Sequence, residues 1–223
     1  MVKKNKNQNS KIMQILSTND CIDYMKSIRF MENRVNKIIK NKEPELIWLL
    51  FHPKIYTYGN TSNKNDFIKK PLIPVYKTNR GGQITYHGPG QRIIYYMINL
   101  NNRKKDIRNF INKIEKIAID TLYELGVVCE SRDDRIGIWV TKVNGRKLKK
   151  ERKIGSIGIK IKKWVTYHGL SININTDLRY FDFINPCGIT NYDVTSLKAL
   201  GINIDIKKFD KILLSKSTKY LKI

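Results

Sequence analysis

RGGQITYHGPGQ, the run from Arg80 to Gln91, is the stretch of this sequence that most constrains its structure. It contains four glycines among arginine, threonine, histidine and glutamine residues. Glycine permits positive φ angles and lets main-chain N–H groups come close to a ligand, while the polar side chains can hold a polar head group or a transition-state oxygen. The run therefore predicts the wall of a pocket. The alternative is an ordinary Gly-Pro turn between two strands.

Strand patterns precede and follow this run. The apolar segments Glu45 to Phe51 and Arg92 to Leu100 predict buried strands, and the glycine run is therefore a loop that leads into a strand. Before them, a helix is expected from a cap at Thr18 or Asn19 to about Lys40. Its apolar stripe contains Ile22, Met25, Val35 and Ile39.

Helix and strand patterns also alternate in the second half of the chain. Apolar residues recur at helical spacing from Lys105 to Leu125, and Gly126 is placed to end that helix. An amphipathic stretch from Ile206 to Leu221 predicts a closing helix. Its residues expected to cover the sheet are Phe209, Ile212 and Leu213. The segments with strand-like content between the two helices are Val127 to Cys129, Ile136 to Val143, Lys147 to Ile161 and Thr166 to Ile174.

The connections and the order of these elements indicate the fold class. Asn144-Gly145 is a strong signal for a type I′ hairpin turn, and the Lys-rich segment from Arg146 to Lys153 is expected to be a solvated hairpin arm. A helix, strands, a helix, a cluster of strands and a helix favour an α+β fold over a doubly wound sheet. The length of 223 residues and the lack of a linker predict a single domain, residues 1–223.

Composition limits the function classes. No apolar run approaches the roughly 18 residues that span a bilayer, and no secretory signal is recognisable, which predicts a cytoplasmic protein, or one in a compartment reached by a signal already removed. The net charge of +24 raises nucleic-acid binding as a hypothesis. Lysine is spread along the whole chain together with much Asn and Ile, however, which is typical of compositional drift. The interpretation favoured here is a solvated basic surface that can attract acidic partners.

A tetrapeptide, Thr-Tyr-His-Gly, occurs twice, at Thr85 to Gly88 and at Thr166 to Gly169. Two of the three histidines of the chain lie in these copies, His87 and His168. Chance duplication is one explanation. The shared His-Gly context favours the other, namely two strands or loops that face one pocket.

The three cysteines are widely separated and form no CxxC pair, which argues against disulfides and zinc. Cys21 and Cys129 are interpreted as small buried apolar residues. Cys187 differs, because Pro186 and Gly188 flank it and predict a tight turn that exposes the sulfur near free N–H groups. Such a cysteine is a candidate acyl nucleophile, and a structural loop cysteine is the alternative.

A nucleophilic thiol needs a base or a cation beside it, since an ordinary cysteine is mostly protonated at neutral pH. Candidates for that role are Lys153, His87 and His168. Lys153 begins the sequence KIGSIG, a second glycine-containing strand that is expected to lie against the pocket. With so many lysines in the chain, the residue types alone do not choose among the three.

Four motifs in order, RGGQITYHGPGQ, KIGSIG, TYHGLSINI and NPCGI, resemble the octanoyltransferase (lipoate-protein ligase B) family, from about Glu45 to about Ile189. The resemblance implies the α+β fold of biotin and lipoate ligases, with a mixed sheet flanked by helices. It also implies a nucleophile at Cys187 and, at Lys153, a residue that lowers the thiol pKa and handles protons. The substrate-binding positions implied are Arg80, Gly81, Gly82, Gln83, Ile84, Thr85, Tyr86, His87, Ser156, Ile157, Gly158, Gly169, Leu170 and Ser171.

In that family an octanoyl group moves from acyl carrier protein, where phosphopantetheine carries it, to a lysine of an apo lipoyl domain. The expected partners are octanoyl-acyl carrier protein and lipoyl domains of dehydrogenase complex E2 subunits and the glycine cleavage H protein. ATP is not expected, because a thioester exchanged for a thioester is nearly balanced in energy, and the resemblance implies no metal. The alternatives are an ATP-dependent lipoate or biotin ligase, which would not need Cys187, and a basic RNA-binding module, for which no motif is recognisable.

Overall fold

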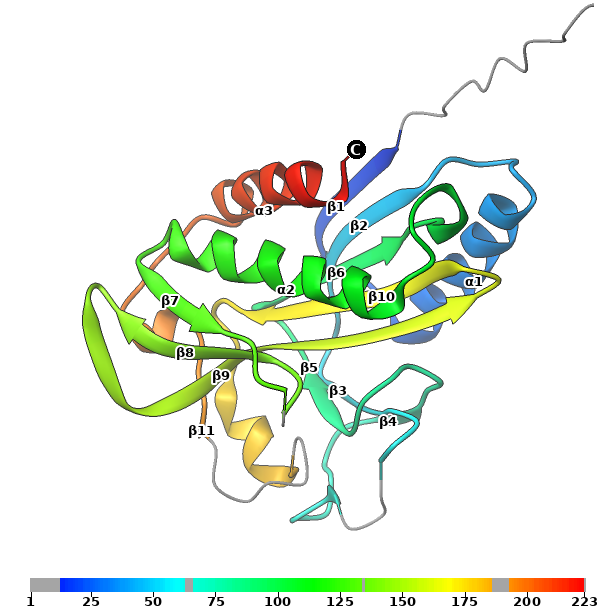
Figure 1. The fold of residues 1–223 in the computed structure, drawn as a ribbon. Helices are drawn as coiled ribbons and strands as arrows, with labels where there is room; N and C mark the ends of the chain where they lie inside the picture. The colour runs from blue at the N-terminus through cyan, green and yellow to red at the C-terminus, as the bar shows by residue number, and fades with distance from the viewer. Residues whose placement is uncertain (1–12, 63–65, 134, 186–192, 223) are drawn as a thin grey trace, which may run out of the picture.

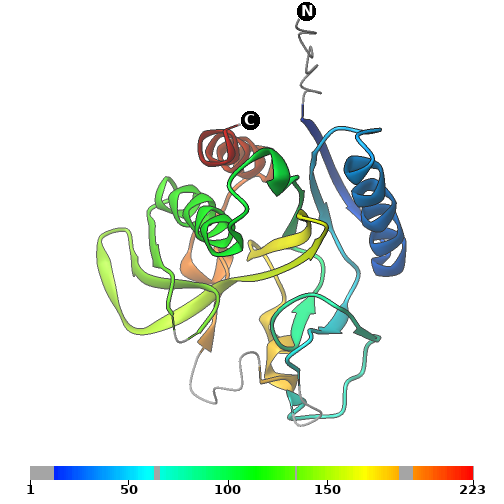
Figure 2. The same cartoon turned by 45° about the vertical axis from the view of Figure 1, so that its right-hand side comes forward.

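A mixed β-sheet with helices on both faces organises the described part of the chain. The computed structural model describes residues 13–62, 66–133, 135–185 and 193–222. The strand order of the large sheet is β1-β2-β6-β10-β9-β8-β7, with β11 paired to β9. Helix α1 covers one face, and α2 and α3 cover the other (Figures 1 and 2). This arrangement confirms the α+β prediction. No helix in these residues is long and apolar enough to cross a membrane.

The N-terminal segment differs from its prediction. Residues Gln14–Cys21 form an edge strand, β1, that pairs in parallel with β2, Leu46–Phe51. Helix α1 begins only afterwards and spans Tyr24–Ile39, with the Asp23 carboxylate accepting the Lys26 N–H at 2.9 Å. The sequence prediction placed the start of this helix too early, because backbone pairing with β2, a tertiary interaction, determines the structure of residues 14–21.

The later start also changes which side chains face the sheet. Val35 is fully buried, whereas Met25 is 40% exposed because it points away from the apolar face. The buried positions of the helix are Tyr24, Ser27, Met31, Arg34, Val35 and Ile38.

The antiparallel centre of the sheet agrees closely with the predicted strands. The strands are β6 (Gln91–Met97), β7 (Val127–Glu130), β8 (Ile138–Val143), β9 (Arg146–Lys162) and β10 (Val165–Asn173). Between β8 and β9, Asn144 and Gly145 both have positive φ, +46° and +79°, which is what a type I′ turn requires. The turn sets the pairing of Val143 with Arg146, and a register shift between Val140 and Lys142 then places Lys153 opposite Trp139.

Each face of the sheet has its own apolar core. Helices α2 (Ile107–Tyr123) and α3 (Ile206–Leu221) pack on one face, and Gly126, with φ +78°, follows the end of α2. Phe209 and Leu213 of α3 are fully buried, as predicted, while Ile212 is only half-buried. On the other face, α1 packs against residues of β2, β6 and β10.

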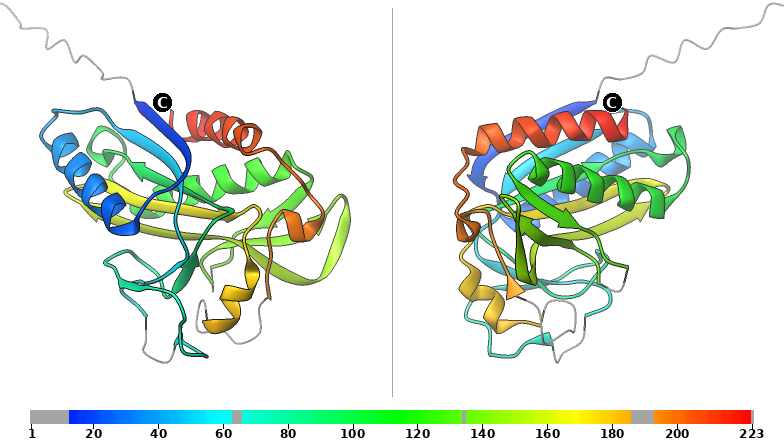
Figure 3. Two further views of the ribbon diagram at one scale, coloured as in Figure 1. Left: turned by 180° about the vertical axis from the view of Figure 1, so that it is seen from behind. Right: turned by 60° about the vertical axis from the view of Figure 1, so that its left-hand side comes forward.

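A second, smaller sheet lies beside the α1 face. It contains β3 (Ile55–Tyr58), β4 (Val75–Lys77) and β5 (Thr85–His87), in the order β4-β3-β5. The 3-10 helix η3 (Leu178–Phe183) packs against it, and further 3-10 turns occur at Leu100–Asn102 and Lys198–Leu200. Strand β11, Asp193–Val194, returns to the large sheet and pairs in parallel with β9 (Figure 3). The glycine run thus contains β5 of the small sheet and leads into β6 of the large one.

A buried ion pair joins three elements at the α3 side. The Arg92 guanidinium, fully buried in β6, donates from Nε to Asp210 Oδ1 at 3.0 Å and from Nη2 to Asp210 Oδ2 at 2.5 Å. It also donates to the Thr18 carbonyl and the Ser17 hydroxyl of β1. Asp210→Ala would leave this cation buried without its carboxylate, so we expect a loss of about 3 to 5 kcal/mol in the free energy of unfolding, measured by urea denaturation.

An exposed ion pair on the same helix provides the control. Lys216 of α3 pairs with Glu124, whose side chain is about half exposed. Glu124→Ala should cost about 1 kcal/mol or less, because water solvates the remaining charge. If Asp210→Ala were no more costly than Glu124→Ala, the buried pair would not hold β1, β6 and α3 together.

Candidate functional site

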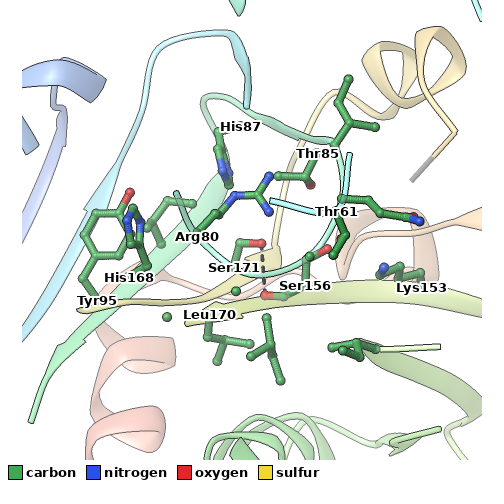
Figure 4. A pocket seen from close by; sticks show the side chains of 18 of the residues that line it. Thr61, Arg80, Thr85, His87, Tyr95, Lys153, Ser156, His168, Leu170 and Ser171 are labelled. Atoms are coloured by element: carbon green, nitrogen blue, oxygen red, sulfur yellow. Dashed lines mark hydrogen bonds between the residues drawn. The ribbon is translucent and has the colours of Figure 1, made fainter. Parts of the chain in front are cut away.

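A cavity of about 240 Å³ lies between the two sheets. Its floor is formed by β9 and β10, and the glycine run covers it, as Figure 4 shows. From the glycine run, the predicted residues that line it are Arg80, Gly82, Gln83, Ile84, Thr85 and His87. From β9 and β10 they are Lys153, Ser156, Ile157, Gly158, Gly169, Leu170 and Ser171. Both copies of Thr-Tyr-His-Gly contribute to this cavity, as predicted from their shared context.

Two predicted residues of the glycine run do not line the cavity. Tyr86 points away from it into the core beneath the small sheet, where its ring stacks on Tyr180 with centroids 4.8 Å apart. Gly81 donates its N–H to the Ile159 carbonyl at 3.2 Å, which fastens the run to β9. The Tyr86 side chain points away from the cavity because side chains alternate along a strand, and its neighbours Thr85 and His87 face the cavity.

Two cross-strand pairs of small residues form much of the cavity floor, so no large side chain covers the backbone there. Ser156 pairs with Ser171, and Gly158 pairs with Gly169. A Cβ on Gly169 would lie 2.1 Å from the Ile94 carbonyl oxygen, and one on Gly158 would lie 3.0 Å from the Gly81 carbonyl oxygen. Glycine is therefore required at Gly169 for β10 to approach β6, whereas a Cβ at Gly158 would make a tight contact with the glycine run.

Lys153 lies at the other end of the floor, in β9. Its residue is 6% exposed, and its Nζ lies 5.5 Å from the centre of the Trp139 ring. Gly137 leaves room for it, since a Cβ there would lie 2.6 Å from Lys153 Cε. On its other side, β11 pairs Val194 with Lys153, and Thr195 donates its N–H to the Lys153 carbonyl at 2.8 Å. Cys187 lies outside the described residues.

Arg80 is a buried cation over the middle of the floor (Figure 4). Its Nη2 donates to the Thr57 carbonyl at 2.8 Å and to the Thr57 hydroxyl at 2.9 Å, and Nη1 donates to the Gly81 carbonyl at 3.0 Å. Burial lowers the pKa of this guanidinium, and no carboxylate among the described residues pairs with it. Main-chain carbonyls and a hydroxyl thus hold the Arg80 side chain in place without neutralising its charge.

All three histidines of the chain lie in one cluster, and His87 and His168 lie near this cation. The rings of His52 and His87 have centroids 5.9 Å apart, and His168 lies beside Tyr95, also at 5.9 Å. Burial lowers the pKa of His52 to about 4 and that of His168 to about 3, and it holds the pKa of His87 well below 6.5. The nearby Arg80 charge acts in the same direction on His87 and His168. The cluster is therefore neutral at pH 7 apart from Arg80.

The backbone of His168 is unusual for a residue within a strand. Its φ is +61°, in the left-handed region that side chains other than glycine rarely adopt. Among the described residues no hydrogen bond reaches its ring, although the side chain is 4% exposed and lines the cavity. Backbone strain of this kind is concentrated at functional sites, which agrees with the position of this residue.

Several lining residues were not predicted from the sequence. They are Tyr24, Thr61, Ile93, Tyr95, Arg135 and Ile136. Alternation along the predicted strand after the glycine run would have identified Ile93 and Tyr95, which follow Gln91 at every second position. Tyr24 and Arg135 come from distant segments, and no local pattern marks them.

The other two cysteines lie outside this cavity. Cys129 is buried in the core beneath α2, as predicted, and burial raises the pKa of its thiol to about 12. Cys21 is exposed at the end of β1, so its prediction as a buried residue was wrong. That error follows from the early helix start, because the strand β1 is an exposed edge.

The lining therefore combines an apolar, glycine-floored channel with a buried lysine at one end. Ile93 and the rings of Tyr24 and Tyr95 supply apolar surface, and the lysine is Lys153. Ile157 and Leu170 pair across the floor, but their side chains pack in the core beneath α2 and α3. Such a channel suits an unbranched acyl chain, with a reacting carbonyl at the lysine end.

Comparisons with known proteins identify the family. The family model for the lipoyl protein ligase A/B catalytic domain matches residues 23–218. An octanoyltransferase of Bartonella bacilliformis is 46% identical over 198 residues, which are 86% of this chain and 81% of that protein. An octanoyltransferase of Wolbachia pipientis wMel is 45% identical over 199 residues, 89% of this chain and 94% of that protein.

Solved structures show the same fold at low sequence identity. Lipoate-protein ligase A bound with ATP has a TM-score of 0.66 at 15% identity, covering 95% of this chain and 85% of that one. The bi-partite lipoate protein ligase from Thermoplasma acidophilum also has a TM-score of 0.66, at 13% identity, covering 95% and 83%. The chain therefore belongs to the lipoyl protein ligase A/B catalytic domain family, as a relative of its octanoyltransferases.

Proposed function

We propose that this acyltransferase takes an octanoyl group from the phosphopantetheine thioester of acyl carrier protein and transfers it to a lysine of an apo lipoyl domain. Cys187 is the proposed nucleophile, and Lys153 is the proposed residue that activates it and handles protons. The observation that carries the proposal is the placement of the buried Lys153 at one end of an apolar channel whose floor contains Gly158 and Gly169.

The described chain supports the pairing of Cys187 with Lys153. Asn185 donates its N–H to the Asp66 carbonyl at 2.8 Å. At Asp193 the described chain resumes as β11, directly beside Arg152 and Lys153. Cys187 is thus six residues from a strand that is hydrogen-bonded next to Lys153. In the family resemblance these two residues are the ones that perform the chemistry.

In the first half-reaction the Cys187 thiolate attacks the carbonyl carbon of the carrier thioester. The new sulfur–carbon bond replaces the bond to the phosphopantetheine sulfur, which leaves and takes up a proton. One thioester replaces another, so this step requires no nucleotide. The methylene chain occupies the apolar channel, and binding of this remote part can orient the carbonyl for attack.

In the second half-reaction the neutral amine of the acceptor lysine attacks the acyl-enzyme carbonyl. The carbon–sulfur bond breaks, the Cys187 thiolate is released, and the proton lost by the amine passes through Lys153 to solvent. An amide forms at the expense of a thioester, which drives the transfer forward.

The positive charge on the surface near Lys153 favours binding of partners with an acidic surface. The hairpin arm leading to Lys153 carries exposed cations at Lys142, Arg146, Lys147, Lys149 and Arg152. Such cations raise the rate of encounter with an acidic protein, and salt weakens the effect.

Transfer in the absence of nucleotide is the direct test of this function. The purified chain should move the octanoyl group from octanoyl-acyl carrier protein to an apo lipoyl domain at the same rate with and without ATP, as followed by the mass of the acceptor. A strict need for ATP, with free octanoate as donor, would instead identify the chain as a ligase, which is the activity of solved neighbours with the same fold.

A further inference from the structure

The cavity has an exposed end and a buried end. At the exposed end Ile136 is 56% exposed, and its neighbour Gly137 packs against the Lys153 side chain. Figure 4 shows Lys153 and Tyr95 on opposite sides of Arg80. At the other end Tyr95 and His168 are each 4% exposed. If the reacting carbonyl lies at Lys153, as the proposed function requires, the tail of the acyl chain points toward Tyr95.

Hydrogen bonds fix the Tyr95 side chain at that end. The Tyr95 hydroxyl lies 2.7 Å from His52 Nε2, and His52 Nδ1 lies 2.6 Å from the Ile22 carbonyl oxygen. A carbonyl can only accept, so Nδ1 carries the proton and Nε2 accepts from Tyr95. His52 is fully buried and does not line the cavity, and both of its ring nitrogens are occupied by these two bonds.

Packing holds the ring as well as the hydroxyl. Tyr95 of β6 pairs with Gly169 of β10 on one side and with Trp48 of β2 on the other. The His168 ring meets it edge-on, with an interplanar angle of 90°. Gly169 and Tyr95 both line the cavity, so an acyl chain that reaches this end meets the Tyr95 ring beside the Gly169 backbone.

We propose that Tyr95, held in position by His52, closes the acyl channel and sets the longest unbranched acyl chain that the site accepts. This inference rests on the proposed function for the direction of the chain. His52 is a positioning residue, because it acts only through Tyr95. Chain length is selected because an extra methylene must displace a ring that two hydrogen bonds in series and three neighbouring rings hold in place.

Fatty-acid binding tests the inference without any transfer chemistry. Calorimetry with hexanoate, octanoate, decanoate and dodecanoate gives the affinity of the wild-type chain and of Tyr95→Leu for each length. One methylene in an apolar pocket is worth about 10- to 200-fold. We therefore expect the ratio of decanoate to octanoate affinity to rise at least about tenfold in Tyr95→Leu.

A neighbouring tyrosine provides the matched control. Tyr96 lies in the same strand, is fully buried and packs in the core on the opposite face. Tyr96→Leu removes the same atoms without touching the cavity, and the affinity ratio should not change. If Tyr95→Leu fails to fold, Ile93→Phe tests the same wall in the opposite direction, because it narrows the channel and should favour hexanoate.

The His52 variants separate positioning from general stability. His52→Ala frees the Tyr95 hydroxyl and should raise the decanoate ratio, while His52→Gln keeps an acceptor and should restore much of the wild-type ratio. An unchanged ratio in folded Tyr95→Leu, or equal ratios in His52→Ala and wild type, would overturn the inference. A wild-type chain that binds no fatty acid also overturns it. One that binds the fatty acids but transfers nothing leaves it standing and contradicts the proposed function.

Discussion

Cys187→Ser is expected to abolish the covalent octanoyl adduct that forms when the chain is mixed with octanoyl-acyl carrier protein. A serine hydroxyl is a much weaker nucleophile than a thiolate unless a dedicated base removes its proton. The expected result is a mass increase of one octanoyl group on the wild-type chain and none on the variant, with transfer reduced at least about a thousandfold. Intact-protein mass spectrometry measures the adduct directly.

The surroundings of the other cysteines make this assignment specific. Cys129 is buried in the core, and a thiol whose pKa is about 12 is protonated at neutral pH. At Cys21, partial burial and then the Asp20 charge raise the pKa of an exposed thiol that lies outside the cavity. Among the described residues no cation lowers the pKa of either thiol, as a reactive cysteine requires.

Variants of these two cysteines are the controls. Cys21→Ser and Cys129→Ala should both form the adduct at the wild-type rate. An adduct of undiminished yield on Cys187→Ser would show that another group accepts the acyl chain, and peptide mapping would identify it.

Much of the fold could be predicted because local patterns determine it. The closing helix was predicted with its observed bounds, Ile206–Leu221, and the Asn144-Gly145 turn fixed the β8–β9 hairpin. Strand β1 could not be predicted, since its exposed residues show no alternation and only pairing with β2 makes it a strand.

The candidate site also contains residues that a local sequence pattern predicts and residues that it does not. The glycine-containing strand KIGSIG and the repeated Thr-Tyr-His-Gly were predicted to face the pocket from the sequence pattern, while Gly158 and Gly169 were named individually by the family resemblance. His52 and Tyr95 could not be related to each other, because their contact joins residues 43 positions apart and depends on how β2 and β6 pair. The contacts of Arg80 could not be predicted either, because main-chain carbonyls accept its hydrogen bonds and no sequence pattern marks them.

Acid is expected to destabilise the fold strongly between pH 6.5 and pH 4.5 because of the three buried histidines. In the unfolded chain each has an ordinary pKa near 6.5, and below that pH it binds a proton. In the folded chain His52 and His168 stay neutral until about pH 4 and pH 3, and His87 also stays neutral well below 6.5. The unfolded state therefore binds more protons in this range, so stability falls as pH falls.

The magnitude follows from the same linkage. When a histidine is charged in the unfolded state and neutral in the folded state, lowering the pH by one unit reduces the free energy of unfolding by about 1.4 kcal/mol. Two units therefore reduce it by at most about 2 to 3 kcal/mol per histidine. For the three histidines together we expect a total loss of about 6 kcal/mol by pH 4.5, measured by urea unfolding across the pH range. Above pH 7 the histidines should contribute no further change.

NMR of the imidazole Cε1–H signals distinguishes this cause from the titration of carboxylates, because the chain has only three histidines. In the folded protein all three signals should keep the chemical shift of neutral imidazole from pH 7 to pH 5. Protonating His87 or His168 would place a second positive charge beside Arg80 in a buried site, which the fold opposes. A histidine that titrates near pH 6.5 while the chain stays folded would show that water reaches the cluster. That histidine would then contribute nothing to the loss of stability in acid.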